Sequence, residues 1–80
     1  MMKHVSILGS TGSIGRQSLD VISRMEGVEV TALTSGTSVE RMEAQCRQFR
    51  PRLAVMATQV AAEDIARRLG DLPIRIEYGE

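Results

Sequence analysis

The stretch ILGSTGSIGRQSLDVI, from Ile7 to Ile22, decides the fold of this chain. An apolar, strand-like run leads into GSTGSIG, and a helix-like run follows without a break. Gly9, Gly12 and Gly15 have the spacing G-x-x-G-x-x-G, a variant of the dinucleotide-binding fingerprint. Glycines at this spacing are informative only between a strand and a helix, and that is where they stand here. The stretch therefore predicts a turn that holds the phosphates of a dinucleotide.

Each glycine has an expected role in this turn. Gly9 allows the tight turn off the strand, Gly12 lets backbone amides approach a pyrophosphate without a Cβ in the way, and Gly15 lets the helix pack close to the sheet. The N-terminus of the helix then offers free N–H groups and its positive dipole end to the phosphates. Hydroxyl groups can add further donors, from Ser10, Thr11 and Ser13.

Two competing motifs fail on spacing. A nucleoside-triphosphate P-loop needs G-x-x-x-x-G-K-[ST], but Gly9 to Gly15 is one residue too long and Arg16 stands where the lysine should be. A nucleophile elbow needs G-x-S-x-G, but Thr11 occupies the first glycine position before Ser13. One alternative stays open: the stretch could be a glycine-rich turn that binds no ligand, with serines that only cap the helix.

Periodicity and turn residues predict the order β-α-β-α-β-α-β for the chain. The expected strands are Val5 to Leu8, Val28 to Leu33, Leu53 to Ala57 and Ile74 to Tyr78, and the expected helices are Ile14 to Met25, Ser38 to Phe49 and a third between Thr58 and Gly70. This pattern is typical of α/β proteins with a Rossmann-type, doubly wound parallel sheet. We expect the sheet order 3-2-1-4, with the fourth strand on the far side of the first. Residues 1–80 would then be the front part of a cofactor-binding domain that lacks its second half.

The end of the second strand indicates which dinucleotide binds. NAD-binding units usually carry an acidic residue there for the ribose 2′-hydroxyl, but the first acid here is Glu40. Thr37 and Glu40 have the spacing of a capping box, so Glu40 is expected to face the helix. A 2′-phosphate could then sit on the amides and hydroxyls of Gly36, Thr37 and Ser38, with Arg41 as a weaker candidate. NADPH is favoured over NADH.

Composition excludes several other functions. Ten Lys and Arg residues balance ten Asp and Glu residues, so no charge excess points to nucleic acid or a membrane surface. The N-terminal apolar run is too short for a signal peptide, and a single cysteine cannot form an internal disulfide, which together favour the cytoplasm. Cys46 falls on the apolar stripe of the second helix and His4 begins a strand without metal-binding neighbours. We expect no catalytic residue and no metal ligand within the chain.

The motifs ILGSTGSIG and LDV, followed by VTALTSG and RMEAQCRQFRPRLAVM, resemble the N-terminal NADPH-binding domain of the 1-deoxy-D-xylulose 5-phosphate reductoisomerases. The similarity spans most of the 80 residues. It implies cofactor contacts at Thr11, Gly12, Ser13 and Ile14, and again at Gly36, Thr37 and Ser38. The chain departs from the family at the second cluster, where Gly-Thr-Ser replaces the common Gly-x-Asn and the serine has a shorter reach.

The resemblance also implies a reaction. Enzymes of this family rearrange 1-deoxy-D-xylulose 5-phosphate and reduce the resulting aldehyde with NADPH to 2-C-methyl-D-erythritol 4-phosphate, in non-mevalonate isoprenoid biosynthesis. A divalent metal, Mg²⁺, Mn²⁺ or Co²⁺, is held by carboxylates of a later catalytic domain, and the whole enzyme is expected to be a homodimer. The 80 residues alone should therefore be inactive. The alternatives are another NADP-dependent dehydrogenase, of the semialdehyde dehydrogenase type, and a non-enzymatic nucleotide-sensing module.

Overall fold

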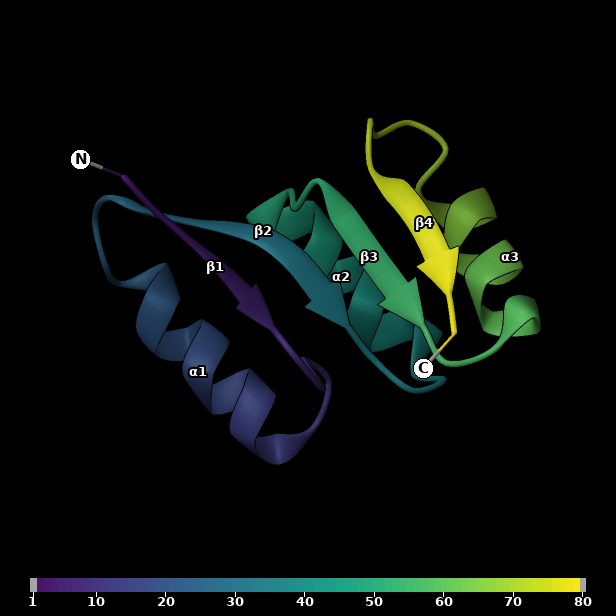
Figure 1. Ribbon diagram of the computed structural model, residues 1–80, viewed down its shortest axis with the longest axis horizontal. Coiled ribbons are helices and arrows are strands. Elements are labelled where there is room, and N and C mark those ends of the chain that lie inside the picture. Colours follow the sequence, from purple (N-terminus) through teal and green to yellow (C-terminus); the bar gives the residue numbers. More distant parts are fainter. Residues whose placement is uncertain (1, 80) are drawn as a thin grey trace.

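Strands and helices alternate along the whole of the chain. A computed structural model describes residues 2–79. Its elements are β1 (Lys3–Ile7), α1 (Ser13–Ser23), β2 (Val28–Thr34), α2 (Val39–Phe49), β3 (Leu53–Met56), α3 (Gln59–Arg68) and β4 (Arg75–Tyr78). This confirms the predicted order, and the α/β class with it (Figure 1). None of the helices in the described residues is long and apolar enough to cross a membrane.

All four strands are parallel and lie in the order β1-β2-β3-β4. The predicted neighbours of the first three strands are correct, but the predicted place of the fourth strand beside β1 was wrong. β4 pairs with β3, from Leu53 opposite Arg75 to Met56 opposite Tyr78. The reason is that α3 packs beside α2 and contacts both β3 and β4, so the chain returns directly next to β3.

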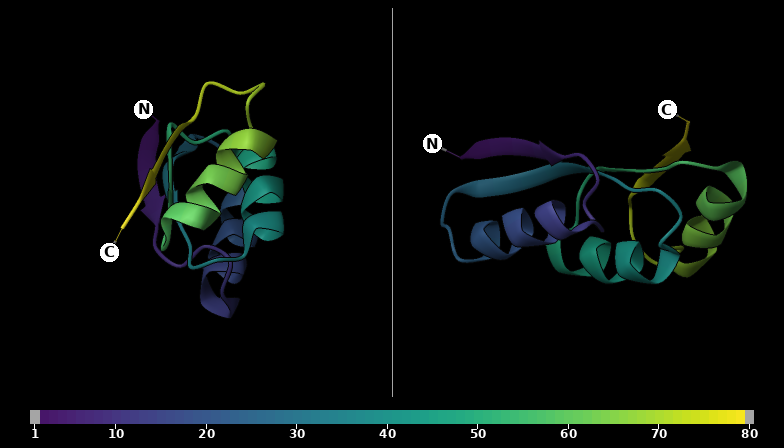
Figure 2. Two further views of the ribbon diagram at one scale, coloured as in Figure 1. Left: turned by 90° about the vertical axis from the view of Figure 1, so that its right-hand side faces the viewer. Right: turned by 90° about the horizontal axis from the view of Figure 1, so that it is seen from below.

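All three helices cover the same face of the sheet (Figure 2). Crossovers between parallel strands are right-handed, so three successive crossovers in one direction place their helices on one side. The double winding expected from the sequence is therefore not found in residues 2–79. The other face carries no helix there, and it is the face toward the viewer in Figure 1.

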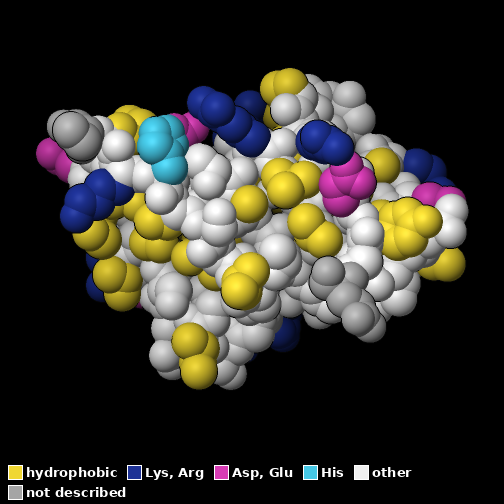
Figure 3. All heavy atoms as spheres, in the orientation of Figure 1, with side chains coloured by type: hydrophobic (Ala, Val, Ile, Leu, Met, Phe, Trp, Pro, Cys, Tyr) yellow, Lys and Arg dark blue, Asp and Glu magenta, His cyan; other side chains and the backbone are white. Residues whose placement is uncertain are grey.

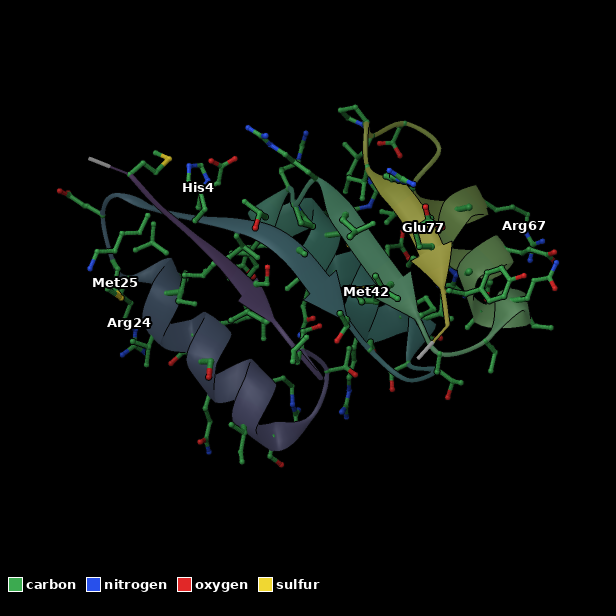
Figure 4. All side chains as sticks on the ribbon, viewed as in Figure 1. His4, Arg24, Met25, Met42, Arg67 and Glu77 are labelled. Atoms are coloured by element: carbon green, nitrogen blue, oxygen red, sulfur yellow. The ribbon has the colours of Figure 1, made fainter. Side chains whose placement is uncertain are left out.

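The core lies between the sheet and the helices. Leu33, Ala54 and Met56 of the sheet and Met42 and Cys46 of α2 are completely buried. Figure 4 shows Met42 at the centre of the molecule, at the sheet and α2. The predicted packing role of Cys46 is confirmed, and burial raises the pKa of its thiol to about 11.

A bulge in β2 decides which side chains reach this core. Val5 pairs with Val30 and Ser6 with Ala32, so Thr31 is an extra residue in β2. Its hydroxyl donates to the carbonyl of Val5 at 3.1 Å. Because side chains alternate along a strand, the extra residue moves Leu33 to the helix side and leaves Ala32 on the open face.

The open face is partly apolar. Ala32, Leu53 and Val55 are half-buried there, whereas the residues that follow them along the strands are fully buried on the helix side: Leu33, Ala54 and Met56. Figure 3 shows apolar side chains over this face. Two side-chain contacts accompany them, the His4 ring with Glu29 and the ion pair of Arg75 with Glu77.

Candidate functional site

The two predicted cofactor-binding segments lie at the same edge of the sheet. One follows β1 and the other follows β2, and Ile7 at the end of β1 pairs with Leu33 near the end of β2. Both loops therefore start side by side at the carboxyl ends of the strands (Figure 1). In open parallel sheets this is the edge where ligands bind.

The glycine-rich loop is a tight turn closed by a hydrogen bond from the Gly12 amide to the Gly9 carbonyl, 3.1 Å long. Gly9 has a φ of +66°, in the left-handed region that favours glycine. At Gly15 a Cβ would lie 2.7 Å from the Cα of Ser10 and closer still to the Gly9 oxygen. Gly15 therefore lets α1 pack against the loop itself.

Gly12 is a glycine for a different reason. It is the N-cap of α1 with a φ of −78°, which any residue adopts, and a Cβ there would meet only the Gly9 oxygen at 3.4 Å. The backbone and its surroundings would thus accept a side chain. A side chain at this position would instead obstruct the exposed surface above the first turn of α1.

That first turn is suited to an anion. Among the described residues, the backbone N–H groups of Thr11, Ser13 and Ile14 have no acceptor. No acidic residue occupies the first turn of α1, so nothing opposes its positive dipole end. Unpaired amides at a helix N-terminus fit a phosphate group.

Hydrogen bonds tie the loop to the end of β2. The amide of Gly9 donates to the Thr34 hydroxyl at 3.0 Å, and the amide of Ser10 donates to the Thr34 carbonyl at 2.7 Å. The hydroxyls of Thr11 and Ser35 share a hydrogen bond of 2.6 Å. Thr34 and Ser35 were missed in the sequence, where nothing distinguishes them from ordinary residues at the end of a strand.

The predicted hydroxyl donors of the loop differ in their exposure. Ser10 is completely buried, and the hydroxyl of Thr11 is occupied by Ser35, so in this conformation neither hydroxyl is available to a cofactor. Ser13 and Ile14 are exposed on the first turn of α1. The backbone amides and Ser13 therefore remain as the groups that can contact a phosphate.

The second cluster opens onto solvent. Gly36, Thr37 and Ser38 are exposed. They adjoin an open hollow of about 580 Å³, lined by Thr37, Ser38, Val39, Glu40, Arg41, Asp64 and Arg68. A Cβ on Gly36 would meet no atom within 4 Å, so the space beside it is free.

The capping box predicted at the start of α2 was wrong. Ser38, not Thr37, is the N-cap, and its side chain makes no capping hydrogen bond. The amide of Val39 instead donates to the Thr37 carbonyl at 2.9 Å, which starts the helix one residue later. Glu40 is exposed in the first turn of α2 and does not stand at the end of β2.

Arg41 joins the two clusters. Arg41 lines the hollow, and its guanidinium donates to the carbonyl of Thr11 at 3.3 Å. One turn further along α2, the side chain of Gln45 donates to the carbonyl of Ser10 at 2.7 Å. Gln45 was missed in the sequence, although a polar residue next to the buried Cys46 is a signal that could have found it.

His4, which was set aside in the sequence, lies away from this edge. Figure 4 shows His4 near the start of β1, at the end opposite the glycine-rich loop, and its ring lies 3.1 Å from Glu29. In residues 2–79 no three His, Cys, Asp or Glu side chains are grouped as metal ligands would be.

Known proteins with similar sequences share one activity. The family model described as 1-deoxy-D-xylulose 5-phosphate reductoisomerase matches residues 5–80. The enzyme of this name from Laribacter hongkongensis is 46% identical over 80 residues, which are 99% of this chain and 21% of that protein. That from Heliobacterium modesticaldum is 48% identical over 83 residues, covering 100% of this chain and 21% of its own length. The chain thus spans about a fifth of the length of the curated relatives it matches.

Solved structures agree with the sequences. The reductoisomerase from Zymomonas mobilis in complex with NADPH matches with a TM-score of 0.93 and 29% identity, over 99% of this chain and 21% of that one. A reductoisomerase in complex with NADPH, fosmidomycin and magnesium matches with a TM-score of 0.92 and 26% identity, over 99% and 20% of the two chains. Together with the two loops at one sheet edge, these similarities show that the chain belongs to the 1-deoxy-D-xylulose 5-phosphate reductoisomerase family.

Proposed function

We propose that the chain holds the phosphates of NADPH in a 1-deoxy-D-xylulose 5-phosphate reductoisomerase. The observation that carries the proposal is the row of unpaired amides of Thr11, Ser13 and Ile14, next to the exposed second cluster. The pyrophosphate would bind these amides, with Gly12 leaving room for its approach. Gly9 and Ser10, which the glycine motif also predicts as cofactor-binding residues, would shape the loop.

The second cluster would bind the adenosine end of the cofactor. The exposed amides and hydroxyls of Gly36, Thr37 and Ser38 can surround a 2′-phosphate, with Arg41 beside them. No carboxylate stands at the end of β2, where one would hold the ribose hydroxyl of NADH and repel a 2′-phosphate. NADPH is therefore the preferred cofactor.

The whole enzyme would rearrange 1-deoxy-D-xylulose 5-phosphate and reduce the product with NADPH to 2-C-methyl-D-erythritol 4-phosphate. When bound, NADPH supplies the hydride and a divalent metal such as Mg²⁺ polarises the substrate oxygens. This chain's residues bind and orient the cofactor, while the metal ligands and the substrate pocket belong to later parts of the protein. The 80 residues alone would not turn over substrate.

Residues 1–80 would be the first part of a larger cofactor-binding domain. Apart from its partner β2, β1 has no neighbouring strand among residues 2–79, and Leu8 and Val21 beside it are 78% and 56% exposed. The helix-free face of the sheet is also partly apolar, at Ala32, Leu53 and Val55. Apolar surface of this extent is usually covered, and we assign its cover to the remainder of the same protein.

The balanced charge of the chain fits a small-molecule enzyme, and a net charge of zero does not favour binding to nucleic acid or to a membrane surface. We place the full-length enzyme in the cytoplasm as a homodimer. The two alternatives, a semialdehyde dehydrogenase and a nucleotide sensor, are not favoured, because the relatives described above are reductoisomerases.

The test is an activity assay of the full-length protein that carries this chain. Purified enzyme with Mg²⁺ should consume NADPH only when 1-deoxy-D-xylulose 5-phosphate is added, and mass spectrometry should identify 2-C-methyl-D-erythritol 4-phosphate. Consumption should be slower with NADH at the same concentration. A folded protein that consumes no NADPH with this substrate would contradict the proposal.

A further inference from the structure

We propose that α2 is a strut that sets the shape of the glycine-rich loop, through Gln45 and Arg41. The two residues are four apart, so they lie on the same side of the helix, one turn from each other. Gln45 donates to the carbonyl of Ser10 at 2.7 Å and Arg41 to the carbonyl of Thr11 at 3.3 Å. Successive carbonyls of the loop are thus fixed by successive turns of α2.

The geometry of the peptide bond links this contact to the cofactor site. The carbonyl of Ser10 and the amide of Thr11 belong to one peptide group, which is trans because the described chain has no cis bond. In a trans peptide the C=O and N–H groups point in opposite directions. By drawing the Ser10 oxygen toward α2, Gln45 turns the unpaired Thr11 amide away from α2.

The other amides of the turn are already occupied. The amide of Ser10 donates to the Thr34 carbonyl, and that of Gly12 donates back to Gly9. Of the amides within the turn, that of Thr11 therefore remains free to bind a ligand. The direction of this N–H group depends on the orientation of the Ser10–Thr11 peptide group, which Gln45 holds.

The surroundings of Gln45 argue against a role in stability alone. Its side-chain oxygen is buried without a hydrogen-bond partner among the described residues, and so is the hydroxyl of Ser10. Unpaired buried polar atoms are unfavourable for folding. A methionine of similar length would pack at this position without that cost, but it could not donate to the loop.

This inference rests on the proposed function, because the strut matters through the pyrophosphate that the loop binds. NADPH and NADH share the pyrophosphate. Loss of the Gln45 contact should therefore weaken both cofactors by the same factor, whereas loss of a 2′-phosphate contact would weaken NADPH alone. Gln45 is a positioning residue, since it contacts the loop and not the cofactor.

The test uses the full-length protein with Gln45→Met, and Gln48→Met as the matched control. Gln48 is on the same helix and is exposed, and its side chain makes no hydrogen bond to a described residue. Calorimetric titration of Gln45→Met should show that Kd rises about fivefold to tenfold for both NADPH and NADH. This increase corresponds to the loss of about one hydrogen bond. The KM for 1-deoxy-D-xylulose 5-phosphate should be unchanged. Unchanged affinities in a folded Gln45→Met protein would overturn the proposal.

Hydrogen exchange tests the strut without any nucleotide. The amides of Ser10 and Gly12 should exchange faster in Gln45→Met than in the wild type, and at the wild-type rate in Gln48→Met. If the wild type binds no NADPH, the proposed function fails, and the exchange rates alone decide on the strut. Arg41→Leu removes the second donor from an exposed side chain, so it serves the same comparison if Gln45→Met does not fold. If the amides of Ser10 and Gly12 exchange at the wild-type rate in both Gln45→Met and Arg41→Leu, the proposal that α2 sets the shape of the loop is contradicted.

Discussion

Replacing Gly12 and Gly15 by alanine in the full-length protein should separate cofactor binding from folding. The two glycines belong to one motif and lie within one turn of each other, but their surroundings differ. At Gly12 the φ of −78° suits alanine, and the new methyl group would be 3.4 Å from the Gly9 oxygen. At Gly15 the methyl group would lie 2.7 Å from the Ser10 Cα and closer to the Gly9 oxygen.

These contacts set the expected magnitudes. In Gly15→Ala, better helix propensity stabilises by about 1 kcal/mol, whereas relieving the overlap costs about 1–3 kcal/mol. Both contacted atoms are backbone atoms, which cannot rotate away, so we expect the upper end and a net destabilisation of about 1–2 kcal/mol. Gly12→Ala should change the stability by less than about 0.5 kcal/mol. Its methyl group would stand in the path of the pyrophosphate and should weaken NADPH binding at least about tenfold, or about 1.4 kcal/mol.

Thermal unfolding and NADPH titration of both variants measure the two effects separately. Gly12→Ala should unfold at the wild-type temperature and bind NADPH weakly. Gly15→Ala should unfold at a lower temperature, and its displaced loop should also bind poorly. A Gly12→Ala protein that binds NADPH as the wild type does would refute the reasoning, because the loop would then not face the phosphates.

Three further predictions concern other parts of the chain. Thr37→Ala combined with Ser38→Ala should weaken NADPH binding by at least about thirtyfold and leave NADH binding unchanged, as measured by titration, since each of the two lost hydrogen bonds to a charged phosphate contributes about 1 kcal/mol or more. Equal losses for both cofactors would place the 2′-phosphate elsewhere. In the folded protein, burial raises the pKa of the Cys46 thiol from 9.0 to about 11. As the pH rises, the thiol therefore loses its proton at a lower pH in the unfolded chain than in the folded one. Stability should therefore fall as the pH rises between about 9 and 11, by about 3 kcal/mol in total, and Cys46→Ala should remove this dependence in denaturation curves measured across that range. Arg47 lowers the pKa of Asp71 through hydrogen bonds of 2.9 and 3.2 Å. The ion pair contributes stability above the ordinary pKa of the carboxyl group and loses it as the pH falls through the lowered pKa, so Asp71→Asn should flatten the acid side of a Tm-against-pH profile.

The element order could be predicted from the sequence because its signals are local. Thr58 accepts a hydrogen bond from the amide of Ala61 at 3.2 Å, as its place before the third helix predicted. Pro51 and Gly70 follow the ends of α2 and α3, and residues of these two types commonly end a helix. Glycine spacing likewise placed the glycine-rich turn correctly between a strand and a helix.

The position of β4 could not be predicted in this way. Its alternating charged and apolar residues would suit either edge of the sheet, and the choice depends on the direction in which α3 crosses. The bulge at Thr31 is similarly invisible, because an extra residue in a strand changes the pairing and not the local pattern. The expected double winding followed from the wrong strand order.

At the candidate site, the positions of the two loops in the fold could be predicted, and the residues that support the loops could not. Thr34, Ser35 and Gln45 hold the loop through contacts between segments that are 24 to 35 residues apart. A capping box predicted from Thr37 and Glu40 was wrong because the Thr37 carbonyl accepts the first bond and shifts the helix start. Such choices depend on tertiary contacts that local spacing does not contain.

A crystal structure of the full-length protein with NADPH would test the central claim most directly. The account predicts pyrophosphate oxygens within hydrogen-bond distance, about 3 Å, of the amides of Thr11, Ser13 and Ile14. It also predicts the 2′-phosphate beside Gly36, Thr37 and Ser38, at the second cluster. A cofactor bound with its pyrophosphate away from the first turn of α1 would contradict the account.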